Sequence, residues 1–234
     1  CARTQEQLLL AVIFSSGLLS AVCINDIVCL LFTPIVLSVC RQTGAAPLPY
    51  LLATAMASNI GSAATLLGNP QNILIASLSG LSFVHYATVA LPFSLLGLAC
   101  LYVFLRFHYR QTLKAPLQVR SQAAVGAFHP YLVKKSLLVL SGILVGYAAG
   151  GDLAVLSGLG GALLLVTRRI KPNKIYTGID FNLLVMFSGL FVVVAGVNAS
   201  GLLPLFSRHL PDGLLQTPAA FSMLTVLLSN IVSN

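Results

Sequence analysis

The chain has 234 residues, of which 57% are hydrophobic and 8% are charged, and its mean hydropathy is +0.94. Soluble domains carry about 25% charged residues, so these charges are too few to cover a soluble protein, while the high apolar content excludes disorder. The apolar runs are continuous and predict an all-α polytopic membrane protein. The net charge of +8 does not indicate nucleic-acid binding, because the basic residues lie in short loops between apolar runs.

Two apolar stretches open the chain between Glu6 and Arg41, and the one acidic residue between them is Asp26. A spanning helix needs about 20 apolar residues, and each stretch is somewhat shorter. Because Asn25 and Asp26 make a good turn sequence and a poor lipid-facing one, we predict that residues 7–40 form a re-entrant helical hairpin with its turn at this pair. The alternative is two ordinary spanning helices, which also return the chain to the same side.

A long stretch without charge follows, from Gln42 to Leu105, and its length suits two membrane crossings. The first crossing, about residues 49–79, contains the sequence SNIGSAATLLGNPQN at 58–72. Gly, Asn and Pro at this density interrupt a helix, so we predict an unwound transmembrane helix here. The second crossing is predicted at about residues 86–105.

The remaining spans are predicted at about residues 136–149, 153–166 and 181–197, with a re-entry from about 218. Lys and Arg gather in the loops 106–135 and 168–174, which is typical of cytoplasmic loops. The stretch 201–217 is therefore predicted to lie outside. The first basic loop could touch anionic lipid, but a role in setting membrane orientation explains its composition.

The polar break at 58–72 is the main candidate binding site. Irregular backbone at membrane depth is tolerated where it is buried in protein or lines a cavity. Unwound carbonyls and amide side chains suit a sodium ion, and the amide groups at a helix N-terminus suit an anion. The alternative is a proline-kinked helix whose polar groups pack on neighbouring helices. The substrate-binding candidates in this segment are Ser58, Asn59, Ser62, Thr65, Asn69 and Asn72.

Asp26 is the candidate for ion coupling, since an ionisable residue in the membrane interior is costly and usually functional. The alternative is that Asp26 caps the second arm of the hairpin. Asn25 beside it is a candidate for both substrate binding and coupling. Gly61 and Gly68 join the coupling set, because glycine lets the backbone approach a ligand closely.

Two Ser-Asn pairs, ending at Asn230 and Asn234, close the chain in an apolar run. With one hairpin entering from inside and the other from outside, they indicate inverted-topology repeats with the site at the repeat interface. Ser233 and Asn234 therefore join the substrate-binding candidates. Catalytic and metal-ligand spacings are missing from the sequence, so we expect neither an enzyme, nor a metal site, nor a cofactor.

These motifs resemble a known family. The sequences NDIVCLLFTPIVL (25–37) and ASNIGSAATLLGNPQNILI (57–75) are similar to the ion transporter superfamily. That superfamily includes citrate-transporter-like permeases, divalent anion:sodium symporters, arsenite-efflux permeases and a group of sodium/proton antiporters. The segment FNLLVMFSGLF (181–191) resembles the opening helix of the family's second repeat. Asn25-Asp26 stands where the symporters usually have Ser-Asn-Thr, which leaves proton coupling open.

The resemblance implies a secondary active transporter that moves a small anion by alternating access. The anion would be a carboxylate, sulfate-like or arsenite, and Na⁺ or H⁺ would be the coupling ion. The alternatives are a Na⁺/H⁺ antiporter of the same superfamily and a passive anion channel. We expect a multi-pass protein of the plasma (inner) membrane, with the lipid bilayer and the anion as partners and a homodimer as the assembly to consider.

The expected organisation has three parts. Residues 1–110 form a first repeat without its N-terminal part, residues 111–175 form a basic cytoplasmic loop with two short connecting spans, and residues 176–234 start a second repeat. The sequence begins at Cys1 and stops at Asn234 within a motif. We therefore expect a fragment of a longer protein.

Overall fold

A computed structural model of the chain describes residues 4–117, 130–166, 181–201 and 217–232. Every regular element in these ranges is a helix, which confirms the all-α prediction. Three of the described helices are long and apolar enough to cross a membrane, namely α2 (Asn25–Thr43), α5 (Phe83–His108) and α7 (Pro130–Ala148). The chain separates into two units, residues 1–170 and 171–234, which are described in turn.

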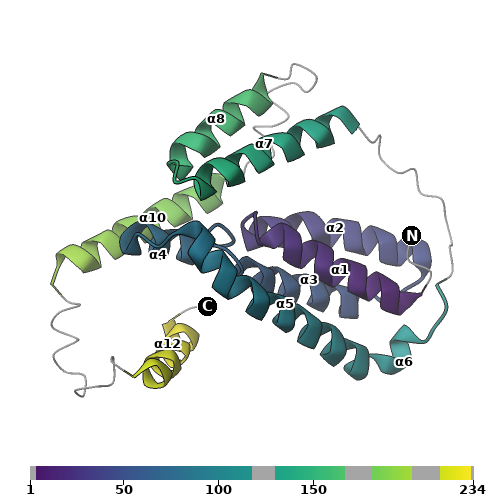
Figure 1. Cartoon of the computed structure of the whole chain (residues 1–234). Helices are drawn as coiled ribbons and strands as arrows, with labels where there is room; N and C mark the ends of the chain where they lie inside the picture. Colours follow the sequence, from purple (N-terminus) through teal and green to yellow (C-terminus); the bar gives the residue numbers. More distant parts are fainter. Residues whose placement is uncertain (1–3, 118–129, 167–180, 202–216, 233–234) are drawn as a thin grey trace. The chain divides into compact units, whose positions relative to one another are not determined.

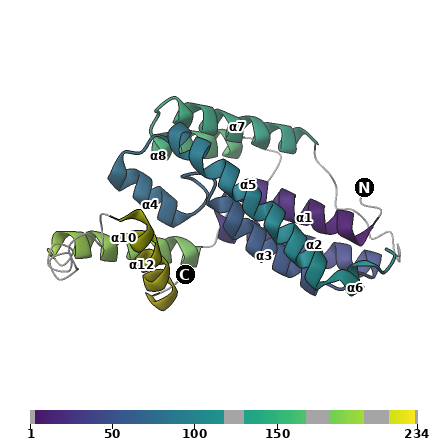
Figure 2. The same cartoon turned by 60° about the horizontal axis from the view of Figure 1, so that its bottom comes forward.

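In the first unit, helices α1 (Gln5–Ser20), α2, α3 (Leu48–Ser62) and α5 pack side by side, and α3 contacts the other three (Figure 1). The same bundle is seen from another direction in Figure 2. Local signals set its boundaries: the Thr4 hydroxyl accepts a hydrogen bond from the Gln7 N–H and caps α1, and Gly44 ends α2 with a left-handed φ of 67°. Helix α3 thus contacts all three other helices, while its Leu52 and Met56 side chains remain exposed.

The core of the bundle lies between α1, α2, α3 and α5. Leu9, Ile13, Tyr50 and Leu98 are almost completely buried there. Apolar side chains on the outer faces are exposed, and Phe93 on α5 is 72% exposed. Because lipid tails are as apolar as these side chains, such an outer surface is typical of a helix that faces lipid.

The turn between α1 and α2 lies directly before the polar pair that was predicted to form it. Residues 21–24 make the turn, and Asn25 and Asp26 already lie in the first turn of α2. The prediction that this pair forms the turn is therefore wrong, although two antiparallel arms follow each other as expected. A first helical turn accommodates such polar residues, because its N–H groups have no partners within the helix.

The predicted break is confirmed. Helix α3 ends at Ser62, residues 63–69 are not helical, and α4 (Pro70–Ser79) follows. The Asn69 side chain accepts a hydrogen bond from the Asn72 N–H, so Asn69 caps α4 with Pro70 in its first turn. Residues 63–69 are called the break from here on.

After α5, a short helix α6 (Arg110–Leu113) continues the chain. Helices α7 and α8 (Leu153–Leu165) then form a hairpin. Its turn contains Gly150 with a φ of 93°, and the Asp152 side chain caps α8 by accepting from the Val155 N–H. The turn thus lies at the predicted Gly-Gly-Asp sequence.

In the second unit, the described residues form α10 (Phe181–Ala199) and α12 (Pro218–Val232). Their large apolar side chains are mostly exposed, as for Val185 at 72% and Val192 at 71%. The predicted boundaries between repeats, at residues 110 and 175, remain a prediction.

Candidate functional site

The turn between α1 and α2 is bonded directly to the break. The Ser20 hydroxyl donates to the Ser58 carbonyl at 2.7 Å, and the Thr65 hydroxyl donates to the Ala21 carbonyl. The Asn25 backbone N–H donates to the Gly68 carbonyl at 3.0 Å. Two segments about 40 residues apart in sequence are thus held as one polar unit, which we call the junction: residues 20–26 together with residues 58–72.

A pair of amide side chains lies on the surface of the junction. The Asn25 Nδ2 donates to the Asn59 Oδ1 at 2.8 Å, and Asn59 is exposed while Asn25 is half-buried. This bond leaves the Asn25 Oδ1 and the Asn59 Nδ2 without another hydrogen-bond partner among the described residues. The pair therefore presents one acceptor suited to a cation and one donor suited to an anion.

The side chain of Asn72, in α4, is bonded to the break. Its Nδ2 donates to the Thr65 carbonyl at 2.8 Å, and it lies 3.4 Å from both the Ser62 carbonyl and the Tyr86 hydroxyl. The Tyr86 hydroxyl in turn donates to the Ala63 carbonyl at 3.2 Å. The Asn72 Oδ1 has no hydrogen-bond partner among the described residues, and the ligand role of Asn72 remains a prediction.

The hydroxyl groups at the end of α3 and in the break are used for internal bonds. The Ser58 hydroxyl lies 2.9 Å from the Cys29 sulfur and 3.0 Å from the Ala55 carbonyl, and the Ser62 hydroxyl donates to the Asn59 carbonyl at 2.8 Å. Ser58, Ser62 and Thr65 are buried. These three residues shape the break, and their predicted contact with substrate remains a prediction.

Tyr86 and Cys29 belong to this network although the sequence reasoning passed over them. Both lie in apolar runs, where a single hydroxyl or thiol reads as an ordinary packing residue. Their hydrogen-bond partners lie on other segments of the chain, so no local spacing in the sequence indicates these bonds. Tyr86 could have been identified from its phenol group, because a tyrosine hydroxyl usually has a hydrogen-bond partner when it is buried.

The two predicted coupling glycines lie where backbones meet. A Cβ on Gly61 would stand 2.0 Å from the Gly17 carbonyl oxygen, and a Cβ on Gly68 would stand 2.0 Å from the Ser62 carbonyl oxygen. The close approach that these glycines permit in the structure is therefore to protein backbone. Gly17, which sequence reasoning missed, completes the crossing of α1 and α3.

Asp26 is exposed and occupies the second position of α2. The N-cap position belongs to Ile24 and has no side-chain cap bond, so the alternative that Asp26 caps the helix is wrong. In the part of the chain that the structure describes, its carboxylate has neither an ion pair nor a hydrogen bond. A negative charge in the first turn is favoured by the helix dipole, and the carboxylate remains available to a cation.

The other site predictions can be placed briefly. Asn69 caps α4, and its Nδ2 also lies 3.3 Å from the Ser62 hydroxyl. Ser233 and Asn234 lie outside the described residues. Among the residues that the structure describes, no group of three His, Cys, Asp or Glu residues is placed to hold a metal ion.

Several curated proteins that are similar in sequence to this chain are named as transporters. A protein named arsB from Dictyostelium discoideum is 39% identical over 99 residues, which is 42% of this chain and 18% of that protein. An uncharacterized transporter of Mycobacterium tuberculosis is 26% identical over 214 residues, covering 86% of this chain and 49% of the relative. The silicon efflux transporter LSI3 of Oryza sativa subsp. japonica is 26% identical over 282 residues, covering 94% and 58%.

The chain spans between 18% and 58% of the length of these curated relatives. All of its residues, 1–234, match the family model described as citrate transporter. The family and the relatives' names confirm the resemblance to the ion transporter superfamily. The chain belongs to the citrate transporter family.

Proposed function

We propose that the protein containing this chain is a secondary active transporter of a small anion, driven by Na⁺ or H⁺ through alternating access. The observation that carries this proposal is the junction, in which a helix break is bonded to a hairpin turn within an apolar chain. Irregular backbone of this kind is expected where a membrane protein binds its substrate. The relatives' names support transport in general, and that of LSI3 refers to silicon efflux.

The chemistry of the junction suits an anion and a cation together. The Asn59 Nδ2 offers a donor to a carboxylate, sulfate-like or arsenite oxygen. The Asn25 Oδ1 and the Asp26 carboxylate offer oxygen ligands to Na⁺, and Asp26 offers a site for H⁺. Binding of both species at one junction is what coupled movement requires.

A Na⁺/H⁺ antiporter of the same superfamily is the second candidate. The Asp26 carboxylate favours it, because it is exposed, has no ion pair among the described residues, and could bind a cation without any anion. A passive anion channel is the third, and large single-channel currents would support it. We place the transporter in the plasma (inner) membrane as a multi-pass protein, and a homodimer is the assembly to test.

The proposal is tested with the full-length protein in proteoliposomes, by counterflow of sulfate, phosphate, carboxylates and arsenite and by Na⁺/H⁺ exchange. Asn59→Ala should lower saturable transport about tenfold or more, because it removes a hydrogen bond to an ionic ligand. Gln42→Ala is the matched control, since Gln42 also bonds a single neighbour, Ser38, but lies away from the junction. Its transport should stay normal.

Two results would count against the proposal. One is that the parent protein transports none of these solutes. The other is that Asn59→Ala and Gln42→Ala behave alike. Both variants should express at the parent's level, because Asn59 is exposed and the Gln42 bond lies outside the core.

A further inference from the structure

A second polar site lies far from the junction along the chain, where α5 ends. Glu6, Arg106, Arg110 and Lys114 line a cavity of about 490 Å³ together with Val103 and Phe107. This volume is within the range of small-ligand pockets, about 300–1,000 Å³. We call this cavity the basic pocket.

The wall of the basic pocket is held in place by buried contacts. Leu113 of α6 is only 4% exposed and belongs to the core. The Gln5 Nε2 donates to the Ala115 carbonyl at 2.9 Å, and the buried Tyr50 hydroxyl donates to the Gln5 Oε1 at 3.1 Å. The segment after α5 is therefore fixed against the start of α1. Basic residues that only set orientation would need no such anchoring.

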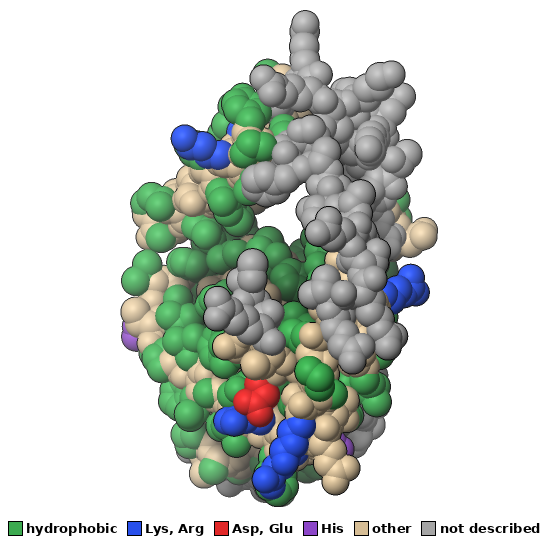
Figure 3. All heavy atoms as spheres, turned by 90° about the vertical axis from the view of Figure 1, so that its right-hand side faces the viewer, with side chains coloured by type: hydrophobic (Ala, Val, Ile, Leu, Met, Phe, Trp, Pro, Cys, Tyr) green, Lys and Arg blue, Asp and Glu red, His purple; other side chains and the backbone are tan. Residues whose placement is uncertain are grey.

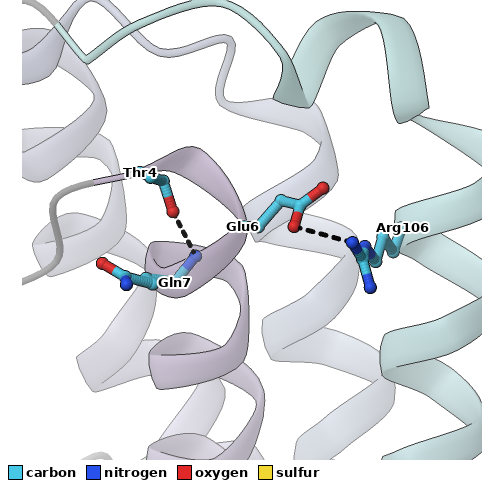
Figure 4. Close-up of polar contacts among 4 residues, drawn as sticks. All are labelled: Thr4, Glu6, Gln7 and Arg106. Carbon is cyan, nitrogen blue, oxygen red and sulfur yellow. Dashed lines mark hydrogen bonds and ion pairs between the residues drawn. The ribbon is translucent and has the colours of Figure 1, made fainter.

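The charges of the basic pocket are unbalanced. Arg106 pairs with Glu6 at 3.1 Å across α1 and α5, as Figure 4 shows. Arg110 and Lys114 are exposed and have no anionic partner among the described residues. In Figure 3, acidic and basic side chains gather close together on a face that is otherwise largely apolar or uncharged. Three cations facing one carboxylate leave two positive charges for an anionic ligand.

The position along α5 indicates where that ligand comes from. Helix α5 is an apolar candidate span of 26 residues, and Arg106 lies in its last turn. At about 1.5 Å per residue, α5 exceeds the hydrocarbon core of about 30 Å, so its basic end reaches the headgroup region. Val103 is 64% exposed and Phe107 is 80% exposed beside the cations. A free phosphate ion would gain nothing from these apolar side chains, whereas an acyl chain would cover them.

We propose that the basic pocket binds the headgroup phosphate of an anionic phospholipid, with Arg110 and Lys114 contacting the phosphate and Val103 and Phe107 contacting the acyl chains. This site does not depend on the proposed transport. It also does not depend on which side of the membrane the pocket faces, because symmetric vesicles present the lipid on both sides.

The test uses a tryptophan inside the basic pocket. These 234 residues contain no tryptophan, so F107W becomes the sole reporter once any tryptophan elsewhere in the full-length protein is replaced by phenylalanine. The protein is reconstituted with brominated phosphatidylglycerol or brominated phosphatidylcholine, and quenching is measured against the mole fraction of each lipid. F107W should be quenched at lower mole fractions of the anionic lipid.

Removing each cation should lower this preference about fivefold, since one basic residue near an anionic surface contributes about that factor. R110Q and K114Q are therefore introduced into F107W, singly and together. With both substitutions the preference for the anionic lipid should nearly vanish. K134Q is the matched control, because Lys134 is exposed on α7 and does not line the pocket. It should keep the preference. Raising the salt to 0.5 M should weaken the preference in F107W alone, because exposed charges are screened.

Three results would overturn the proposal. The first is equal quenching by the two lipids in F107W. The second is that K134Q loses as much of the preference as R110Q and K114Q do. This result would indicate that the preference comes from the overall surface charge and not from the basic pocket. The third is displacement of the brominated lipid by millimolar inorganic phosphate, which would assign the basic pocket to a dissolved anion.

Discussion

Gly61 has no room for a side chain, because its backbone lies against that of Gly17 at the crossing of α1 and α3. Gly61→Ala would place a methyl group 2.0 Å from the Gly17 carbonyl oxygen, so the helices must separate. Overpacking of this kind costs about 1–3 kcal/mol. We expect the unfolding free energy of the purified protein, measured in mixed micelles with increasing SDS, to fall by that amount.

Gly142→Ala is the matched control, since a Cβ there meets no atom within 4 Å. It should leave the unfolding free energy unchanged or raise it, because alanine favours a helix more than glycine does. Equal destabilisation by both substitutions would show that the α1–α3 crossing is not the tight contact described above.

Asp26 is expected to carry the coupling ion. Asp26→Asn keeps the shape of the side chain but removes its charge, so ion-driven accumulation should be lost while substrate exchange across the membrane continues. Both are measured in proteoliposomes with and without an ion gradient. Asp152→Asn serves as the control, because Asp152 caps α8 and asparagine caps equally well. If Asp26→Asn accumulates substrate as well as Asp152→Asn does, Asp26 is not the coupling residue.

Single residues were easier to find from the sequence than their partners. Asn25, Asn59 and Asn72 stand out because amides are rare in apolar runs. Their bonds join positions that are 34 residues apart for Asn25 and Asn59 and 14 apart for Asn72 and Tyr86. Such pairs depend on how helices pack, and no local pattern encodes them.

Among the elements, α4 depends on its cap. Asn69→Ala removes the side-chain acceptor for the Asn72 N–H and the contact with the Ser62 hydroxyl. Loss of such a cap costs about 1 kcal/mol, so the first turn of α4 should fray. Hydrogen exchange at the amides of Asn72 and Ile73, which both bond to Asn69, should speed up about fivefold, which is the corresponding factor. Asn69→Ser should restore slow exchange, and unchanged exchange in Asn69→Ala would show that Pro70 alone fixes this helix start.

Most of the helices were predictable from the sequence, because the length of an apolar run and the helix-breaking residues at its ends define a helix. The break within 58–72 and the Gly-Gly-Asp turn before α8 follow from residues whose backbone preferences are strong. The first hairpin turn lies just before the predicted pair, because Asn and Asp serve both turns and first helical turns. Only a neighbouring segment of the same chain, through the bond from Asn25 to Gly68, distinguishes a turn from a first helical turn here.

For the whole molecule, the charge distribution predicts the membrane orientation. We expect loops 106–135 and 168–174 to face the cytoplasm and residues 201–217 to face outward. A single cysteine at position 120, in a background without the five native cysteines, should react with an impermeant thiol reagent only after the cells are opened. A cysteine at position 210 should react from outside, and labelling of position 120 in intact cells would contradict the orientation and the inverted repeat together.

Membrane class and family could be read from the sequence, because composition and the 57–75 motif are properties of the chain alone. The organisation into two inverted repeats remains a prediction. The basic pocket was hidden, because Glu6 and Arg106 are 100 positions apart.

The bond from the Asn25 N–H to the Gly68 carbonyl gives the junction a built-in spectroscopic label. The first N–H groups of a helix have no partner within it and normally exchange with solvent quickly. The N–H of Asn25 is protected by another segment of the chain, so its exchange rate reports whether turn and break are joined. In an NMR spectrum, one backbone resonance would thus record each separation of the two segments, without any added probe.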